Sequence, residues 1–251
     1  MRDETNSSNP SSAERARSIV LRHGWNSTSF QIVNPGIDRW FSPDGEAVIG
    51  YVTANRIRIV VGAPVCDEDR LPDISAEFEE EASRSGERVC YFGAEARLES
   101  IYQGSRGHTR FLLGAQPIWI LDEWPGIVAA DRSLRAQLNR AKNKGLTVSE
   151  WPISRADRHP ELSSCLQEWL ATKGLPPLHF MVESDTLARL DGRRVFVAEQ
   201  AGAVQGFVVL SPVAKRKGWL FEQFPHRPGA PNGAVETMID AAMRKLAADG
   251  F

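Results

Sequence analysis

The side chains best suited to chemistry gather near the carboxyl end of the sequence. Glu222 ends a strand-like run, and Glu236 lies one turn into the helix that follows. A carboxylate at a strand end could act as a general base on an attacking hydroxyl or amine, and one in the first helical turn could pair with a cationic amine. Glu222 could equally be an edge-strand acid paired with a surface cation. Glu236 could equally be a first-turn acid that the helix dipole favours.

The segment between them, "HRPGAPNG" at 226–233, has the composition of an anion-binding loop. The first turn of a helix presents unpaired N–H groups and a partial positive charge. Gly229 and Gly233 would let the backbone approach an anion, His226 and Arg227 add positive charge, and Asn232 could cap the helix. We predict substrate contacts from His226, Arg227, Asn232 and Gly233, although a well-capped helix after a turn would look similar.

A second candidate is the basic segment "DRSLRAQLNRAKNKG" at 131–145. Asp131 is a candidate N-cap and Gly145 a candidate C-cap, so the segment should be a helix. It carries five basic residues and, after Asp131, no acidic residue. Spacings of three and four residues place Arg132, Arg135 and Asn139 on one face. A solvated basic face is the ordinary explanation, and phosphate contact with RNA or a lipid headgroup is the functional one. The predicted phosphate-contacting residues are Arg135, Asn139 and Arg140.

Composition excludes several other classes of protein. A chain of 251 residues with a net charge of -2 has no overall attraction for nucleic acid or anionic membranes, so any such binding must be local. Cys66, Cys90 and Cys165 are far apart and form no CxxC pair, which predicts reduced, buried thiols in a cytoplasmic protein and no metal site. No apolar run approaches the ~20 residues of a membrane span. The Ser/Asn-rich residues 1–12 are predicted to be a disordered tail.

The elements that must position these residues alternate between helices and strands. Periodicity and turn residues predict helices at 13–23, 71–86, 94–104, 131–145, 160–174 and 233–248. They predict strands at 46–53, 57–62, 87–94, 117–121, 146–151, 193–200, 203–213 and 218–224. Both halves combine helices with a hairpin, which indicates a duplicated α/β unit. The predicted domains are residues 13–120 and 121–251.

Several motifs together resemble a known family. The segments "HGWNSTSFQ", "WFSPDGEAVIGYV", "LRAQLNRAKNKG", "LPPLHFMVE" and "APNGAVETMIDAAM" occur in this order. They are similar to the soluble synthase domain of the bacterial phosphatidylglycerol lysyltransferases, the C-terminal part of multiple peptide resistance factor proteins. The resemblance runs from about Arg22 to the end of the sequence.

The resemblance implies an α/β (α+β) protein with tandem GNAT-like, that is acyl-CoA N-acyltransferase-like, folds. It implies transfer of an aminoacyl group from aminoacyl-tRNA to a hydroxyl of phosphatidylglycerol without a cofactor, by a cytoplasmic protein peripheral to the inner face of the membrane. Glu236 matches the acidic residue that recognises the aminoacyl amine, and Leu134 to Arg140 match the basic helix. His226 stands where relatives usually carry arginine.

The resemblance also implies that the second fold is truncated, because the family domain continues past the last helix with another strand. A homo-oligomer could then complete the sheet. In the predicted mechanism Glu222 deprotonates the acceptor, the loop amides bind an anionic group and Glu236 holds the amine. Two alternatives stay open: an acyl-CoA-dependent N-acyltransferase, whose usual (Gln/Arg)-x-x-Gly-x-(Gly/Ala) signature is absent, and a degenerate binding module without catalysis.

Overall fold

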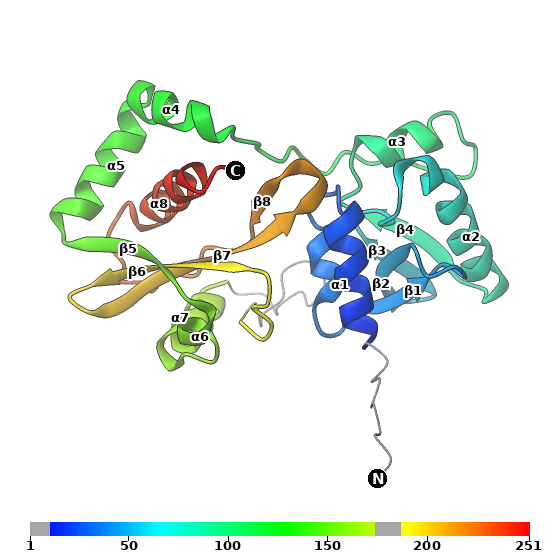
Figure 1. Ribbon diagram of the computed structural model, residues 1–251, viewed down its shortest axis with the longest axis horizontal. Helices are drawn as coiled ribbons and strands as arrows, with labels where there is room; N and C mark the ends of the chain where they lie inside the picture. The colour runs from blue at the N-terminus through cyan, green and yellow to red at the C-terminus, as the bar shows by residue number, and fades with distance from the viewer. Residues whose placement is uncertain (1–10, 174–186) are drawn as a thin grey trace, which may run out of the picture. The chain divides into compact units, whose positions relative to one another are not determined.

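The computed structural model describes residues 11–173 and 187–251, which form two compact units (Figure 1). Unit 1 comprises the residues up to Phe111 together with Val213–Arg216, and unit 2 comprises Leu112–Pro212 and Lys217–Phe251. Each unit contains one four-stranded sheet with helices, so the predicted mixed α/β class is confirmed. The motif "LPPLHFMVE" and the first ten residues of the predicted tail lie outside the described residues.

Unit 1 begins with a helix whose start the sequence specifies closely. Ser11 caps α1 through a capping box. Its hydroxyl accepts a hydrogen bond from the Glu14 amide, and the Glu14 carboxylate accepts one from the Ser11 amide. The tail predicted for residues 1–12 therefore ends in an ordered cap. The elements of unit 1 are α1 (Ser12–His23), η1 (Ser29–Val33), β1 (Asp38–Phe41), β2 (Val48–Ala54), β3 (Ile57–Val61), η2 (Glu68–Arg70), α2 (Leu71–Arg84), β4 (Arg88–Phe92) and α3 (Ala96–Tyr102).

The sheet of unit 1 has the order β1-β2-β3-β4. The predicted hairpin is confirmed: β2 and β3 are antiparallel, and Asn55 and Arg56 both have positive φ in the tight turn between them. β4 then runs parallel to β3. Helix α2 covers one face, where Phe78 packs against the sheet. On the other face η1 lies so close to β2 that a Cβ on Gly50 would stand 2.7 Å from Ile32.

Unit 2 carries the residues that the sequence analysis selected. Its elements are η3 (Leu121–Glu123), α4 (Trp124–Ala130), α5 (Arg132–Asn143), β5 (Leu146–Trp151), α6 (Ile153–Ala156), α7 (Pro160–Ala171), β6 (Arg194–Gln200), β7 (Ala203–Val213), β8 (Gly218–Phe221) and α8 (Ala234–Ala248), and η4 (Ala214–Arg216) joins β7 to β8. The sheet order is β5-β6-β7-β8, and β6 is antiparallel to both β5 and β7. The antiparallel pair predicted from the "AGA" turn is therefore confirmed.

Two separate cores cover the two faces of this sheet. On the α8 face, Phe196, Ala198, Val208 and Leu210 pack with residues of α5 and α8. On the α7 face, Val195, Val197, Phe207 and Val209 pack with residues of α6 and α7. Figure 1 shows α8 along one side of the strands and α6 and α7 along the other. The face to which a strand residue points therefore decides which helices it can reach.

Two predictions are corrected by the structure. The strand predicted at 117–121 is wrong: these residues form no strand, and Ile118, Trp119 and Ile120 are exposed. Apolar and aromatic composition favours a strand only where a neighbouring strand can pair with it, and no described strand does. The prediction of three buried cysteines is also wrong, because Cys90 is exposed. No helix in the described part of the chain is long and apolar enough to cross a bilayer.

Candidate functional site

The predicted substrate-binding loop runs along β7 before it reaches α8. The Phe207 amide donates to the Pro225 carbonyl at 2.9 Å, which continues the pairing beyond β8. A Cβ on Gly206 would lie only 3.1 Å from the Cβ of His226 and 2.9 Å from the Pro225 carbonyl oxygen. Only glycine at this position lets the two segments come so close, and β7 thereby fixes the backbone of His226.

A one-residue bulge lies between β8 and this loop. The Glu222 amide donates to the Val209 carbonyl at 3.0 Å, and Gly206 and His226 form a β-bridge. Val209 and Gly206 are three residues apart on β7, whereas Glu222 and His226 are four residues apart. Because side chains alternate between the faces of a strand, the extra residue turns His226 to the opposite face from Glu222.

Cross-strand neighbours identify the two faces. Val209, opposite Glu222, packs in the core of the α7 face. Gly206, opposite His226, pairs with Ala198, which packs in the core of the α8 face. His226 therefore shares a face with the helix that carries Glu236, and Glu222 lies on the other face. This geometry does not favour the predicted mechanism in which Glu222 and Glu236 act on one bound substrate.

The N-terminus of α8 differs from its prediction. The N-cap residue is Gly233, and no side chain caps the helix, so the predicted cap by Asn232 is wrong. Gly233 has φ of 91°, and a Cβ there would lie 2.2 Å from the carbonyl oxygen of Gln137 in α5. Glycine is thus required both by the left-handed backbone and by the close approach of α5. Asn232 is exposed beside this uncapped first turn.

Glu236 occupies the first turn of α8, as predicted. Its side chain is half-buried and has no ion-pair partner among the described residues. The positive end of the helix dipole stabilises a carboxylate here. Glu236 is therefore an ionisable group that remains available to a cationic ligand.

Glu222 is already engaged by neighbouring side chains. Its carboxylate forms an ion pair with Arg193 at 2.9 Å, and the two side chains are 6% and 2% exposed. The Ser211 hydroxyl donates to the same carboxylate oxygen, and Arg193 also donates to the Arg189 carbonyl at 2.5 Å. A buried carboxylate that a guanidinium and a hydroxyl already engage cannot reach a substrate hydroxyl without breaking these contacts. This arrangement is that of a structural charge cluster.

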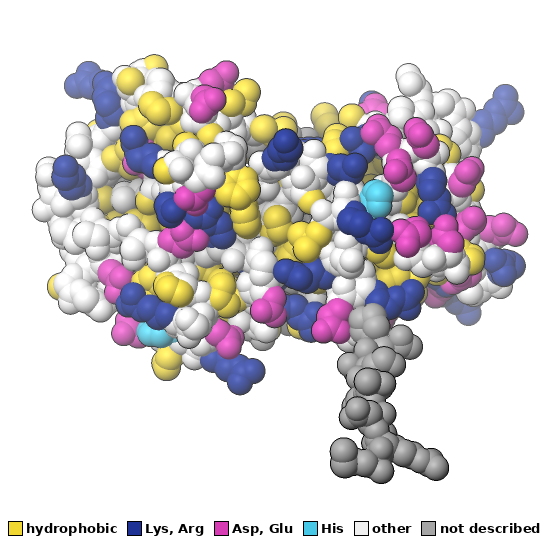
Figure 2. All heavy atoms as spheres, in the orientation of Figure 1, with side chains coloured by type: hydrophobic (Ala, Val, Ile, Leu, Met, Phe, Trp, Pro, Cys, Tyr) yellow, Lys and Arg dark blue, Asp and Glu magenta, His cyan; other side chains and the backbone are white. Residues whose placement is uncertain are grey.

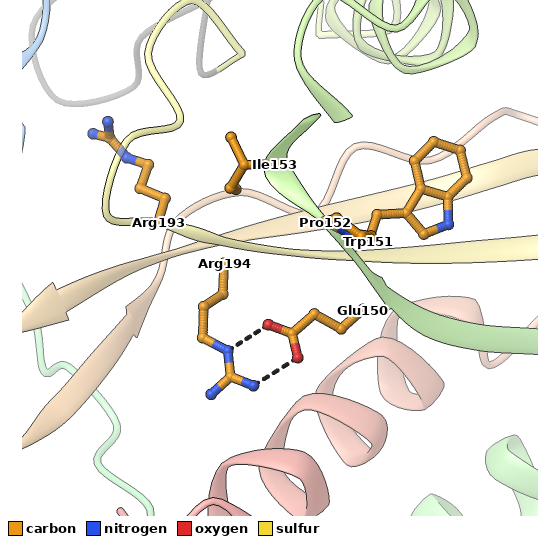
Figure 3. A pocket seen from close by; sticks show the side chains of 6 residues that line it. All are labelled: Glu150, Trp151, Pro152, Ile153, Arg193 and Arg194. Atoms are coloured by element: carbon orange, nitrogen blue, oxygen red, sulfur yellow. Dashed lines mark hydrogen bonds and ion pairs between the residues drawn. The ribbon is translucent and has the colours of Figure 1, made fainter. Parts of the chain in front are cut away.

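Sequence reasoning missed Arg193 and Ser211. The available signal was the pair "RR" at the start of a strand, because alternation must send one of the two arginines to each face. Figure 3 shows this division: Arg193 lies on one side of β6, and Arg194 lies with Glu150 on the side of α8. Burial of an arginine requires a carboxylate on the same face, which here is Glu222.

Arg227 links the loop to α7. Its Nε donates to the Val204 carbonyl at 2.8 Å, and its Nη1 pairs with Glu168. Hydrogen bonds from Arg227 and from Ser164 lower the pKa of the Glu168 carboxyl. The predicted substrate contact by Arg227 would therefore have to compete with an existing ion pair.

Helix α5 begins as predicted, because Asp131 accepts from the Leu134 amide at 2.9 Å. The predicted phosphate contacts divide into two groups. Arg135 donates to the Val128 carbonyl at 3.3 Å and to the Ala129 carbonyl, so it supplies hydrogen bonds to the last carbonyl groups of α4. Asn139 and Arg140 are exposed, and their side chains have no hydrogen-bond partner among the described residues.

The exposed face of α5 also includes residues that were not among the predicted phosphate contacts. At 100° per residue, Arg132 and Asn143 fall on the same face as Asn139 and Arg140, and all four are exposed. The opposite face of α5 contributes Ala141 to the core shared with α8. Acidic and basic side chains are interspersed over the view in Figure 2, so a helix face without carboxylates is a local feature.

A pocket of about 350 Å³ opens where β5 ends and β6 begins (Figure 3). Its lining residues are Glu150, Trp151, Pro152, Ile153, Arg193 and Arg194. Arg194 binds both carboxylate oxygens of Glu150 at 2.7 Å and also pairs with Asp249 at 2.6 Å. These hydrogen bonds raise the pKa of Arg194. Each charged side chain that lines the pocket is thus already ion-paired, Arg193 with Glu222 outside the lining, and the pocket includes none of the predicted site residues.

The chain matches the family described as "Phosphatidylglycerol lysyltransferase, C-terminal" over residues 17–251. It is 27% identical over 219 residues to a lysylphosphatidylglycerol biosynthesis bifunctional protein of Gordonia bronchialis, which covers 81% of this chain and 18% of that protein. It is 25% identical over 203 residues to the phosphatidylglycerol lysyltransferase of Bacillus subtilis, which covers 80% of this chain and 23% of that protein. The chain therefore spans about a fifth of the length of these relatives.

Solved structures agree with this assignment. A C-terminal domain (DUF2156) of Agrobacterium fabrum, described as part of a lysylphosphatidylglycerol synthetase, superposes with a TM-score of 0.83 at 26% identity, over 95% of this chain and 75% of that one. The L-PGS of Bacillus licheniformis has the same fold, with a TM-score of 0.77 at 22% identity, over 95% of this chain and 73% of that one. The resemblance stated from the motifs is confirmed, and the chain belongs to the family of the C-terminal domains of phosphatidylglycerol lysyltransferases.

Proposed function

We propose that this chain transfers an aminoacyl group from an aminoacyl-tRNA to a hydroxyl group of phosphatidylglycerol. The observation that carries the proposal is the family match over residues 17–251. Two relatives bear names that specify lysyl transfer to phosphatidylglycerol or synthesis of its product. Transfer between two esters needs no cofactor, because the bond that breaks and the bond that forms are similar in energy.

The donor end of the reaction fits the first turn of α8. An aminoacyl ester carries a protonated α-amine, and the Glu236 carboxylate is a half-buried acceptor without an ion-pair partner among the described residues. The uncapped amides of the same turn would face the ester carbonyl or an adjacent phosphate. In this arrangement Glu236 binds the amine while the helix terminus binds the negative charge.

The nucleic-acid end fits the exposed face of α5. Arg132, Asn139 and Arg140 are exposed, and no carboxylate lies on the helix among them. With a net charge of -2 the chain has no general affinity for RNA, so a local group of donors must supply the phosphate contacts. Arg135 would contribute indirectly, because it holds the end of α4 against the start of α5.

The direct test is transfer of labelled amino acids from charged tRNA to vesicles that contain phosphatidylglycerol. Glu236→Gln should raise KM for the charged tRNA about 10- to 100-fold, as expected for loss of a hydrogen bond worth roughly 1.5–3 kcal/mol to a charged group. Glu123→Gln, at an exposed acid of unit 2, is the matched control and should leave KM unchanged. Absence of labelled lipid with every amino acid tested would refute the proposed function.

A further inference from the structure

We propose that His226 moves the proton in the transfer step: it accepts the proton of the attacking hydroxyl and returns it to the leaving ribose hydroxyl. The inference rests on the proposed function and assigns to His226 the role that the sequence suggested for Glu222. It depends on three features of the described residues, namely the hydrogen bond at Nδ1, the face to which the ring points, and the engagement of the competing carboxylate.

The hydrogen bond at Nδ1 determines which ring nitrogen can act as a base. Nδ1 of His226 lies 2.8 Å from the carbonyl oxygen of Phe224. A carbonyl oxygen can only accept, so Nδ1 must carry a hydrogen in both the neutral and the charged ring. The neutral ring therefore has its lone pair on Nε2. No described residue forms a hydrogen bond with Nε2, and the side chain is half-buried. The imidazole is thus oriented as a base before any substrate binds.

The position of the ring matches that of the proposed donor site. The bulge after Glu222 turns His226 to the α8 face, and the missing Cβ of Gly206 lets it approach β7 closely. The loop that begins at His226 leads directly into Gly233 and the first turn of α8. Glu236 projects from that same turn. His226 and the helix that carries Glu236 therefore lie on the same face of the sheet.

The charged groups around the imidazole are mostly paired. On the α7 side, Arg227 is bound to Glu168, and Glu161 accepts the Val204 amide at 3.0 Å. On the α8 side, Glu236 is the acid nearest in the chain and has no ion-pair partner among the described residues. Glu222 cannot replace His226 without breaking its ion pair with Arg193.

The step balances without any further reactant. The acceptor hydroxyl attacks the carbonyl carbon of the aminoacyl ester, and its proton passes to Nε2 of His226 as the new C–O bond forms. The tetrahedral intermediate then collapses, and the C–O bond to the ribose breaks. The ribose oxygen takes the proton from Nε2, which restores the neutral ring. Nδ1 keeps its hydrogen throughout, and the Phe224 carbonyl stabilises the charged ring as an orienting acceptor.

Two substitutions at His226 separate proton transfer from charge. His226→Asn keeps an N–H donor near the Nδ1 position and removes Nε2, and His226→Arg supplies a permanent positive charge without a base. Both should lower kcat about 10²- to 10⁴-fold, with little change in KM. His108→Asn, at a histidine of unit 1, should keep wild-type kinetics. If His226→Arg retained wild-type kcat, the side chain would act through charge and the proposal would be wrong.

Folding and tautomer measurements make the test independent of the assay. Thermal unfolding of both variants must match wild type, since a loss of structure would also lower kcat. Long-range ¹H–¹⁵N spectra of the whole chain should show hydrogen on Nδ1 and none on Nε2 in the neutral ring of His226. The opposite tautomer would overturn the proposal whatever the activity. Transfer by wild type with undiminished His226→Asn activity would refute this inference alone, whereas no transfer by wild type would refute the proposed function.

Discussion

Replacement of Arg193 by methionine tests whether the buried ion pair of unit 2 is a structural charge cluster. Methionine keeps much of the length of the side chain and removes the guanidinium. Glu222, whose side chain is 6% exposed, would then retain only the Ser211 hydroxyl as a side-chain donor. A buried carboxylate without its counter-charge is strongly unfavourable in the folded state.

The expected magnitude follows from the burial of both partners. Removal of one partner of a buried ion pair typically costs about 3–5 kcal/mol, and Arg193 at 2% exposure belongs to this class. The exposed pair Arg22–Glu46, at 2.9 Å with side chains 50% and 53% exposed, is the matched control. Arg22→Met should cost less than about 1 kcal/mol, because solvent screens that pair.

A double-mutant cycle isolates the pair from the other contacts of Arg193. Urea unfolding of Arg193→Met, Glu222→Gln and the double variant gives the coupling free energy, which we expect to be about 2–3 kcal/mol. Coupling below about 0.5 kcal/mol would show that Glu222 is not held by Arg193, and it would return Glu222 to the list of candidate bases.

Three further predictions concern single positions in the described residues. Gly233→Ala should destabilise the protein by more than about 1 kcal/mol in urea unfolding, since it strains a left-handed backbone and collides with α5, whereas Gly229→Ala has free space around it and should be nearly neutral. In the native protein Cys90 should react rapidly with a thiol reagent, and the other two cysteines should react only after unfolding, because burial raises the pKa of each to about 11. The hydrogen bond from Arg227 lowers the pKa of Glu168 in the folded state. The stability that this bond adds to the fold is therefore fully present above the ordinary glutamate pKa, and it is lost as pH falls through the pKa of Glu168 in the folded protein. Glu168→Gln should therefore flatten the acid limb of stability against pH, and an unchanged limb would contradict this.

Local signals in the sequence were sufficient for most helices and strands. Helix α5 lies between a side chain that caps its N-terminus, Asp131, and a glycine with positive φ just after its C-cap, Gly145, as the sequence predicted. The hairpin of β2 and β3 follows from alternation and a short polar turn. These features are encoded within a few residues of the chain, so no knowledge of the rest of the fold is needed to predict them.

Features that depend on a distant partner could not be predicted in the same way. Gly233 was assigned to anion binding, but its lack of a side chain is also required by the backbone of Gln137, almost a hundred residues earlier in the chain. Arg135 was assigned to phosphate contact, yet it hydrogen-bonds the carbonyls of α4. In both cases the residue type suits either ligand binding or contact with a neighbouring helix, and only the packing between helices shows the second role.

The assignment of the base depends on one inserted residue. On a regular strand, Glu222 and His226 are four residues apart and would point to the same face, so either could serve the same substrate. The bulge reverses this expectation, because it sends Glu222 toward Arg193 and Ser211 and sends His226 toward the face of α8. A bulge leaves no clear mark in a single sequence, since it is defined by pairing with β7. Deletion of Gln223 would remove the extra residue and leave His226 three residues after Glu222, still opposite Gly206 and on the α8 face. Transfer should therefore survive this deletion, whereas His226→Asn should lower kcat about 10²- to 10⁴-fold with the bulge unchanged.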